Sequence, residues 1–407
     1  MVRDRQHARG LDTIATTAFV STYPPQKCGI AAFTAELAAS VGDREIVALQ
    51  PSAKVGFYPA EVSHRIARDV PADYVSAANW IDSRSFGVVS IQHDYSIWGG
   101  PDGSNVLDFV KSLKTPVVST LHTVLQRPSK SQRSILTKLV RASAATVVMS
   151  ASASELLTST YGADPARVEI VPHGVPDLPF VAPDSVKTQM GLAGRTVILS
   201  FGLVGPDKGY DSAIAAMPAV LRADPKAVYV ILGVTDPELM LQDGETHREQ
   251  LMDLAWSLDV ASQVRFVGRF VTAAELGLWL GAADIFVTPY PGLEQAVSGS
   301  LAYAMGAGKA IVSTPYAYAV EQLADGRGRL VAAGSTESLA EGLVELAKSS
   351  EKRTEYGRKA HAYTRGMLWP VVGAAYREIF ARYGRPITLA EQPVPAKTPK
   401  KVATARA

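Results

Sequence analysis

Residues 196–213, TVILSFGLVGPDKGYDSA, pass from a continuously apolar run through a glycine-containing loop into the start of a helical pattern. The apolar run TVILSFGL (196–203) has the composition of a β-strand that is covered on both faces. The pattern that follows, over 209–223, has apolar residues at helical spacing. A strand, a short loop and a helix in this order form the repeating unit of a parallel α/β sheet.

The same unit recurs along the whole chain, which predicts an α/β fold built on parallel sheets with right-handed crossovers. The predicted strands are 14–22, 45–49, 86–92, 115–121, 145–150 and 168–172 in the first half, and 196–203, 227–234, 264–268, 284–290 and 309–316 in the second. The predicted helices include 30–41, 129–142, 152–160, 209–223, 246–258, 299–307, 335–349 and 370–383.

One segment interrupts the alternation. Residues 173–190, HGVPDLPFVAPDSVKTQM, are rich in proline and have no periodic apolar pattern, which is typical of a domain linker. We therefore predict doubly wound domains over 12–178 and 179–369, with a last helix (370–385) that packs back on the first domain. The tail 387–407 is rich in Ala, Pro and Lys and is predicted to be flexible.

The composition excludes several classes of protein. With 47% hydrophobic and 20% charged residues, the 407-residue chain can form packed cores, and its net charge of +2 gives no field that would attract nucleic acid. A single cysteine, Cys28, excludes a disulfide scaffold and Cys-based zinc sites. The polar start MVRDRQHARGLD and the absence of an apolar run of about 18 residues lead us to expect a cytoplasmic protein with no membrane segment.

Common cofactor motifs are missing from the sequence. No G-x-G-x-x-G follows the first strand of either half, and GAGKA (306–310) lacks the spacing and the hydroxyl residue of a phosphate-binding P-loop. No D-x-D pair, H-E-x-x-H or G-x-S-x-G occurs either. We therefore expect neither a metal site nor a bound cofactor.

Two strand–helix loops are suited to an anion. In YPPQKCGIAAF (23–33), Gly29 allows the backbone of the following helix to approach a ligand, although an ordinary turn explains this segment equally well. In FGLVGPDKGYDSA (201–213), Lys208 stands at a helix start, where a lysine opposes the helix dipole. A bound phosphate would offset that cost, and an exposed lysine without a partner is the alternative.

A third loop precedes the helix at 299–307. Glu294 and Gln295 lead into Val297, Ser298 and Gly299, and small residues at a helix start suit an anion or a sugar held by backbone N–H groups. Close packing of the helix on the sheet explains the small residues but not the polar loop before them.

Polar and aromatic residues follow two strands of the first half. His122 directly follows the apolar strand 115–121, and His93 opens the loop HDYSIWGG, which also carries Asp94, Tyr95 and Trp98. The carboxyl ends of parallel strands are where open α/β sheets bind ligands. A structural role for each histidine and a buried Trp98 are the alternatives.

In these motifs the chain resembles a retaining glycosyltransferase of glycosyltransferase family 4, from about residue 14 to residue 384. GLVGPDKG (202–209) resembles the family's G-R-L-x-x-x-K-G, with Lys208 on the lysine that binds the donor diphosphate and Leu203 in place of the arginine. VPHGVPD (171–177) resembles the family's P-H-G after the last strand of the first domain, and STLHTV places His122 on the histidine that contacts the donor sugar.

Further motifs complete this resemblance. VRFVGRF (264–270) is similar to the family's base-binding loop, which assigns Gly268 and Arg269 to the donor nucleotide. The family's E-x7-E motif is altered, because Gln295 and Tyr303 stand where the two glutamates would be. Glu294 lies one residue before the first position, so a shift of one residue would bring its carboxylate into the sugar subsite. Tyr303 then takes the position that faces the donor ribose.

The resemblance implies a GT-B fold, with two Rossmann-like domains facing a cleft, a donor site in the second domain and an acceptor site in the first. It implies transfer of a hexose, mannose and glucose being the candidates, from a nucleotide sugar to a carbohydrate acceptor, with retention and without a metal ion. His93, Asp94, Tyr95 and Trp98 would face the acceptor.

The same resemblance gives each group near the donor a role. His122 would orient the donor sugar, with Glu294 or Gln295 beside it. Lys208, the amides near Gly29 and the helix start at Val297, Ser298 and Gly299 would stabilise the leaving diphosphate. Arg269 and Lys27 are candidates to replace the missing arginine.

Two other functions stay open at this stage. A GT-B phosphorylase, in which inorganic phosphate attacks a glycoside, would explain the altered E-x7-E motif if nucleotide binding is weak. A sugar-binding protein that has lost catalysis would explain Leu203, Gln295 and Tyr303, although His122 and Lys208 argue against it.

Overall fold

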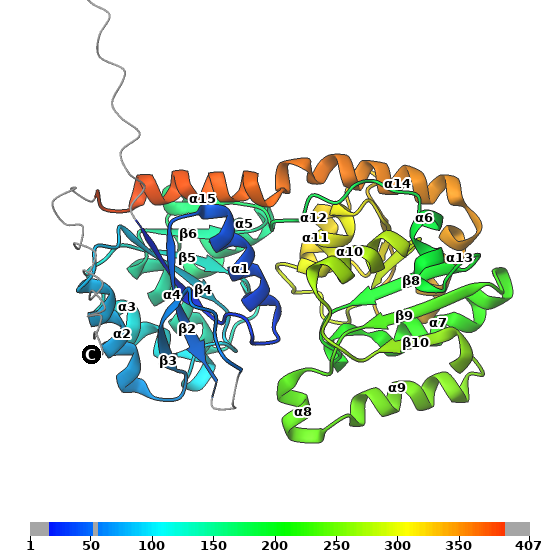
Figure 1. Ribbon diagram of the computed structural model, residues 1–407, viewed down its shortest axis with the longest axis horizontal. Coiled ribbons are helices and arrows are strands. Elements are labelled where there is room, and N and C mark those ends of the chain that lie inside the picture. The colour runs from blue at the N-terminus through cyan, green and yellow to red at the C-terminus, as the bar shows by residue number, and fades with distance from the viewer. Residues whose placement is uncertain (1–15, 52–55, 387–407) are drawn as a thin grey trace, which may run out of the picture.

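The computed structural model describes residues 16–51 and 56–386, so the predicted flexible tail 387–407 lies outside the described residues. Two sheets, each made of parallel strands, form separate halves of the molecule (Figure 1). Two consecutive helices, α14 (Ser350–Tyr363) and α15 (Trp369–Tyr383), run along one side of both halves. The predicted fold class, two doubly wound parallel-sheet domains, is confirmed.

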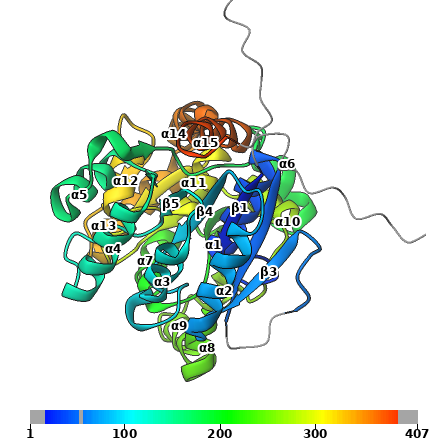
Figure 2. The same cartoon turned by 90° about the vertical axis from the view of Figure 1, so that its left-hand side faces the viewer.

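The first sheet has seven strands, six of which coincide with predicted ones. Helices cover both of its faces (Figure 2). In spatial order the strands are β3 (Val62–Ala67), β2 (Arg44–Gln50), β1 (Thr17–Ser21), β4 (Val88–His93), β5 (Val117–Leu121), β6 (Ala145–Val148) and β7 (Val168–Ile170). The helices of this half are α1 (Gly29–Val41), α2 (Pro71–Asp82), α3 (Asn105–Ser112), α4 (Lys130–Ala142) and α5 (Ala151–Tyr161).

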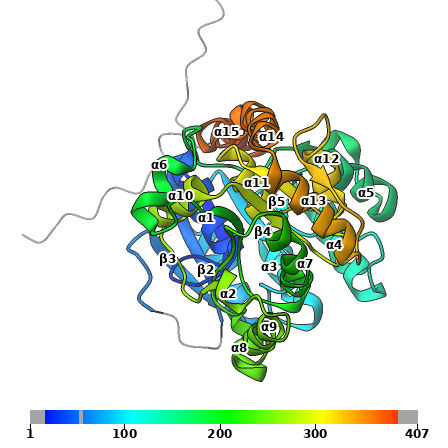
Figure 3. The same cartoon turned by 90° about the vertical axis from the view of Figure 1, so that its right-hand side faces the viewer.

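The second sheet has six strands and its own helices (Figure 3). Its strands are, in spatial order, β10 (Val264–Val267), β9 (Ala227–Leu232), β8 (Thr196–Phe201), β11 (Ile285–Thr288), β12 (Ala310–Ser313) and β13 (Arg329–Leu330). The remaining helices are α6 (Asp184–Lys187), α7 (Tyr210–Ala223), α8 (Pro237–Asp243), α9 (Thr246–Ser257), α10 (Ala273–Ala282), α11 (Gly299–Gly306), α12 (Ala317–Gln322) and α13 (Thr336–Lys348).

The sequence pattern missed two strands, both at sheet edges. β3 alternates between exposed and partly buried positions and includes His64 and Arg65, so it lacks the continuous apolar run of a central strand. β13 has only two residues, Arg329 and Leu330, which are too few to show a pattern. An edge strand has a neighbouring strand on one side only, and in β3 the exposed positions are correspondingly polar.

The chain crosses between the halves twice. The linker after β7 pairs with the segment before α15, through a parallel bridge between Val175 and Leu368. α15 then packs on α1, where a side chain at Gly373 would lie 2.6 Å from the Cβ atom of Ser40. The Tyr376 hydroxyl lies 2.9 Å from the Thr120 hydroxyl of β5. The last helix therefore packs on the first domain, while the domain limits given above stay a prediction.

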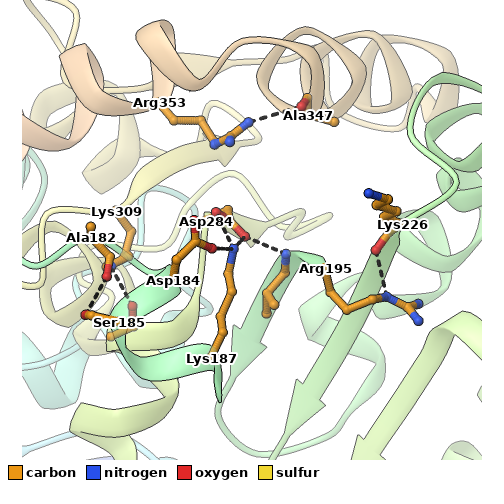
Figure 4. Close-up of polar contacts among 12 residues, drawn as sticks. Ala182, Asp184, Ser185, Lys187, Arg195, Lys226, Asp284, Lys309, Ala347 and Arg353 are labelled. Carbon is orange, nitrogen blue, oxygen red and sulfur yellow. Dashed lines mark hydrogen bonds and ion pairs between the residues drawn. The ribbon is translucent and has the colours of Figure 1, made fainter. Parts of the chain in front are cut away.

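A buried ion pair fixes the linker to the second sheet (Figure 4). Lys187 of α6 lies 2.8 Å from a carboxylate oxygen of Asp284, and both side chains are almost fully buried. The other charged groups around this pair are Asp184, 3.0 Å from the Lys187 ammonium, and Lys309 of the GAGKA segment. The backbone N–H of Val197 also donates to Asp284, at 2.7 Å. A single carboxylate thus joins the linker, β8 and β11.

Among the residues that the structure describes, no helix combines the length and the apolar character needed to cross a membrane.

Candidate active site between the two domains

Several of the predicted site residues lie on loops where the two domains meet. Loops that follow the carboxyl ends of β4, β5 and β7 come from the first domain, and loops that follow β8 and β11 come from the second. We call residues 93–98, 122–127, 172–175 and 289–300 the interdomain seam. Ala296 packs into the core of the first domain, and Val297 packs against the cores of both.

Lys208 lies in the 3-10 turn Pro206–Lys208, between β8 and α7. Its ammonium is 2.6 Å from the Asp207 carboxylate and 5.2 Å from the centre of the Tyr290 ring. Burial alone would lower the pKa of Lys208, but Tyr290 and Asp207 outweigh burial and raise it above its usual value. Lys208 is therefore a permanent cation whose side chain is 21% exposed, a suitable group to meet an anionic ligand.

The start of α11 lies next to this cation. The Ser298 hydroxyl caps the helix by accepting a hydrogen bond from the N–H of Leu301, at 3.3 Å. The Ser300 hydroxyl is 2.9 Å from that of Tyr290, whose ring faces Lys208. The structure thus brings two predicted phosphate-binding groups together, a lysine and a helix N-terminus, through Tyr290.

The two loops that carry these groups are in close contact. A Cβ atom at Gly209 would lie 2.0 Å from the carbonyl oxygen of Pro289. Gly209 also has a positive φ of 65°. Both features require glycine directly after Lys208, because a side chain would collide with the loop that leads to α11.

His122 is a buried, neutral imidazole. Burial lowers its pKa to about 3, although the negative charge of Asp94 acts in the opposite direction. Its Nε2 atom is 2.9 Å from Oε1 of Gln92, and its ring is perpendicular to that of Phe33, with 4.8 Å between the ring centres. A neutral imidazole held on two sides is a weak base, and its role in orienting a ligand stays a prediction.

His173 connects His122 to α11, a role that sequence reasoning did not assign. Its Nδ1 atom lies 2.7 Å from the carbonyl oxygen of Gly174, and its Nε2 atom faces Gly299, where a Cβ atom would lie only 2.8 Å away. Burial lowers the pKa of His173 to about 4. The Phe33 ring stands between the two histidines, 4.8 Å from His122 and 5.0 Å from His173. Its position could have identified His173 from the sequence, because it is a third histidine that follows the end of a strand, here β7.

Glu294 and Gln295 have different surroundings. Glu294 crosses the seam and forms an ion pair with Arg127 of the first domain, at 2.6 Å. Gln295 is turned into its own loop, where its amide donates to the carbonyl oxygen of Val297 at 2.9 Å. Of the two, Glu294 directs its carboxylate toward the other domain. No sequence signal pointed to Arg127.

The structure corrects part of the prediction for the acceptor loop. Trp98 is 2% exposed; its ring packs against Tyr74 and Phe109, and its N–H donates to the carbonyl oxygen of Gln92 at 3.0 Å. A buried indole offers no face to a sugar, so the prediction for Trp98 is wrong. The alternative, that this loop folds a tryptophan into the core, is correct.

His93 is also buried, with no exposed surface, and burial lowers its pKa to about 4. It cannot touch an acceptor in this arrangement, which makes its prediction wrong for the same reason. Asp94 accepts hydrogen bonds from the hydroxyls of Ser96 and Thr123. Burial would raise the pKa of Asp94, but these bonds outweigh it and lower the pKa. Asp94 and Tyr95 are half-buried, and their role toward an acceptor stays a prediction.

Gly29 is the exposed first residue of α1, and the space where a Cβ atom would stand is open. The Cys28 thiol caps this helix by accepting a hydrogen bond from the N–H of Ala31, at 3.3 Å. Lys27 is exposed beside it. An anion role for this helix start stays a prediction.

The predicted nucleotide residues belong to two elements, the loop after β10 and helix α11. Arg269 follows Gly268 at the end of β10 and forms an ion pair with Glu275 of α10, at 2.8 Å. Tyr303 lies in α11, its ring 5.9 Å from that of His173, and burial raises the pKa of its hydroxyl to about 12. No contact between described residues joins Arg269 to Lys208. That Arg269 replaces the arginine missing at Leu203 therefore stays a prediction.

Two family models match the chain, one in each domain. Residues 33–177 match the model described as Glycosyltransferase Family 4, and residues 187–363 match the model described as Glycosyl transferases group 1. The two matches meet at the proline-rich linker.

Curated relatives match the chain at 26–29% identity. A D-inositol 3-phosphate glycosyltransferase of Kineococcus radiotolerans is 29% identical over 242 residues, which are 56% of this chain and 54% of that protein. The phosphatidyl-myo-inositol mannosyltransferase of Mycolicibacterium smegmatis is 26% identical over 315 residues, 76% of this chain and 75% of that protein. The chain spans about half of the length of the D-inositol 3-phosphate glycosyltransferases that it matches in Kineococcus radiotolerans and Catenulispora acidiphila.

Solved structures share the fold. Anabaena HepE, in complex with UDP and glucose, superposes with a TM-score of 0.72 at 13% identity, over 90% of this chain and 100% of that chain. The sucrose-phosphate synthase of Thermosynechococcus elongatus superposes with a TM-score of 0.72 at 14% identity, with the same coverage. The first domain is thus similar to the Family 4 model and the second to the group 1 model, and the chain as a whole has the two-domain GT-B fold.

Proposed function

We propose that the chain transfers a hexose from a nucleotide sugar to a carbohydrate-containing acceptor, with retention of the anomeric configuration. One observation carries this proposal: Lys208 and the start of α11 lie together on the second domain, and His173 and Phe33 connect that helix start to His122 of the first. This arrangement offers positive charge for a diphosphate and a neutral imidazole for a sugar.

The relatives suggest what the substrates are. The matched proteins act as D-inositol 3-phosphate glycosyltransferases and as a phosphatidyl-myo-inositol mannosyltransferase, and HepE binds UDP and glucose. We propose a nucleoside diphosphate hexose as donor, with glucose and mannose as candidates, and an acceptor that carries a cyclitol or a sugar.

The chemistry follows from the leaving group. As the bond between the sugar and the diphosphate breaks, positive charge grows on the sugar ring and negative charge on the leaving oxygen. Lys208 and the amides at the start of α11 would stabilise that oxygen, which is the kind of interaction that strengthens in the transition state. His122 would hold the sugar, and the Glu294 carboxylate would face the positive ring.

Ligand binding provides the first test. UDP, GDP or ADP, or one of their hexose conjugates, is expected to raise the melting temperature, because a ligand that binds the folded state stabilises it. Product analysis by NMR with the stabilising donor should then show the donor's anomeric configuration. Stabilisation by a sugar 1-phosphate with no response to any nucleotide would instead identify a phosphorylase, and inversion would overturn the retaining mechanism.

We expect Glu294 to matter more than Gln295. A hydrogen bond to a charged group is worth about 1.5–3 kcal/mol, so Glu294→Gln should lower kcat/KM about 10- to 100-fold. Gln295→Ala, which removes a bond within the loop, should lower it by less than about tenfold. Tyr303→Phe should mainly raise the donor KM.

Arg127→Ala is the control for this ranking, because it removes the ion pair and leaves the Glu294 carboxylate in place. Steady-state kinetics of the four variants show whether Glu294 or Gln295 contributes more to kcat/KM. A Gln295 variant without activity beside a fully active Glu294 variant would show that an amide holds the sugar.

Catalysis is expected to proceed without a divalent metal ion, because the positive groups described above can meet the diphosphate charge. Activity should stay unchanged in excess chelator after the protein has been dialysed against it. Loss of activity in chelator that magnesium or manganese restores would contradict this expectation.

A further inference from the structure

A carboxylate of the second domain caps a helix of the first. The two oxygens of Glu321, in α12, accept hydrogen bonds from the backbone N–H groups of Ala151 at 2.9 Å and Ser152 at 3.1 Å, which begin α5. The Ser150 hydroxyl accepts the next N–H, that of Ala153, at 3.2 Å. The first turn of α5 is therefore satisfied jointly by its own cap and by the other domain.

This contact is electrostatically favourable, and neighbouring hydrogen bonds hold the backbone of Glu321 in place. The N-terminus of a helix carries a partial positive charge, so a carboxylate in both hydrogen bonds there is stabilising. The Arg327 guanidinium fixes the backbone that carries this carboxylate, since it donates to the carbonyl oxygens of Glu321 at 3.0 Å and Gln322 at 2.6 Å. α5 and α12 lie side by side when the molecule is viewed from either end (Figures 2 and 3).

Two further charged contacts join the domains with the same polarity. Arg127 of the first domain pairs with Glu294 of the second at 2.6 Å. Arg68, in the loop after β3, lies 3.8 Å from Glu238 of α8. In all three places the first domain supplies the positive partner and the second domain the carboxylate.

We propose that these three contacts form an electrostatic latch, in which Glu321 is the positioning residue that holds the domains in the arrangement described here. The latch sets the distance between Lys208 on the second domain and His122 on the first. Its outer contacts are exposed; the Arg127 side chain is 86% and that of Glu238 64% exposed. The screening length of salt falls from about 10 Å at 0.1 M to about 3 Å at 1 M, so high salt weakens such pairs.

Hydrogen exchange tests the latch without any substrate. Glu321→Ala should speed exchange at the amides of Ala151 and Ser152 about tenfold, because a hydrogen bond to a charged group is lost. The radius of gyration from small-angle X-ray scattering should rise in the same variant, and in the wild type when salt is raised from 50 mM to 1 M. Glu321→Gln keeps an acceptor oxygen without the charge, so its exchange should lie in between.

Glu337→Gln is the matched control, since Glu337 is an exposed residue in the first turn of α13 and is remote from the first domain. It should leave both exchange and radius unchanged. Unchanged exchange at Ala151 and Ser152 in the Glu321 variants, or a radius that neither variant nor salt alters, would overturn the latch. Circular dichroism confirms that each variant is folded; should Glu321→Ala unfold, Glu321→Gln carries the test. None of these results depends on the proposed transfer reaction.

Discussion

Replacing Lys208 with alanine is expected to lower kcat about 10²–10³-fold, the loss seen when one preorganised donor to a developing negative charge is removed. Lys208 is the cation that the structure places beside the start of α11, and its pKa is raised above the usual lysine value, so it is charged at neutral pH. Since the diphosphate gains charge as the bond breaks, the effect should fall on kcat more than on the donor KM.

Two variants sharpen this test. Lys208→Arg keeps the positive charge on a different shape and should recover part of the lost activity. Lys348→Ala removes an exposed lysine at the end of α13 and should have no effect. Steady-state kinetics, with the fold checked by circular dichroism, provide the measurement. Activity of Lys208→Ala within a few-fold of the wild type would show that this lysine does not stabilise the leaving group.

Asp284→Asn is expected to lower the stability of the second domain by about 3–5 kcal/mol, because removing one member of a buried ion pair leaves the other charge uncompensated. The ammonium of Lys187 would keep only Asp184, which is 86% exposed, as a charged partner. Asparagine has the same shape as aspartate and can still accept the N–H of Val197, so the loss reports the charge rather than a cavity.

Asp184→Asn is the control, since it removes the exposed partner of the same lysine and should cost less than about 1 kcal/mol. Urea unfolding, followed through the transition of the second domain, compares the two variants. Equal losses in the free energy of unfolding would show that the buried ion pair contributes no more to stability than the exposed one.

The dependence on pH gives an independent check. Burial lowers the pKa of Lys309 to about 8, and the negative charge of Asp284 acts against this shift. The folded protein therefore binds fewer protons than the unfolded chain between about pH 8 and the ordinary lysine pKa near 10.4, and Lys309 adds stability as pH rises through that range. Without Asp284 the pKa of Lys309 falls further, so the cost of Asp284→Asn should shrink as pH is raised.

Much of the fold could be predicted from the sequence because central strands and amphipathic helices each have a characteristic local pattern of apolar residues. All eleven predicted strands are present, from β1 at Thr17–Ser21 to β12 at Ala310–Ser313. Strand β3 was missed because its exposed positions interrupt the apolar run, and β13 was missed because two residues are too few to show a pattern. Trp98 shows the limit for single residues: it stands in a loop, outside any periodic apolar pattern, yet the chain folds its ring onto Tyr74 and Phe109.

The sequence by itself determined the two-domain architecture, the loop that carries Lys208 and the strand ends that carry His93 and His122. Only the tertiary structure decided which side chains meet, since Arg127 and Glu294 are 167 residues apart, Glu321 and Ala151 are 170 apart, and Lys187 and Asp284 are 97 apart. Secondary structure follows from interactions between residues a few positions apart, which a sequence pattern records. A pairing across domains depends on how whole sheets and helices pack, and no local pattern encodes that geometry.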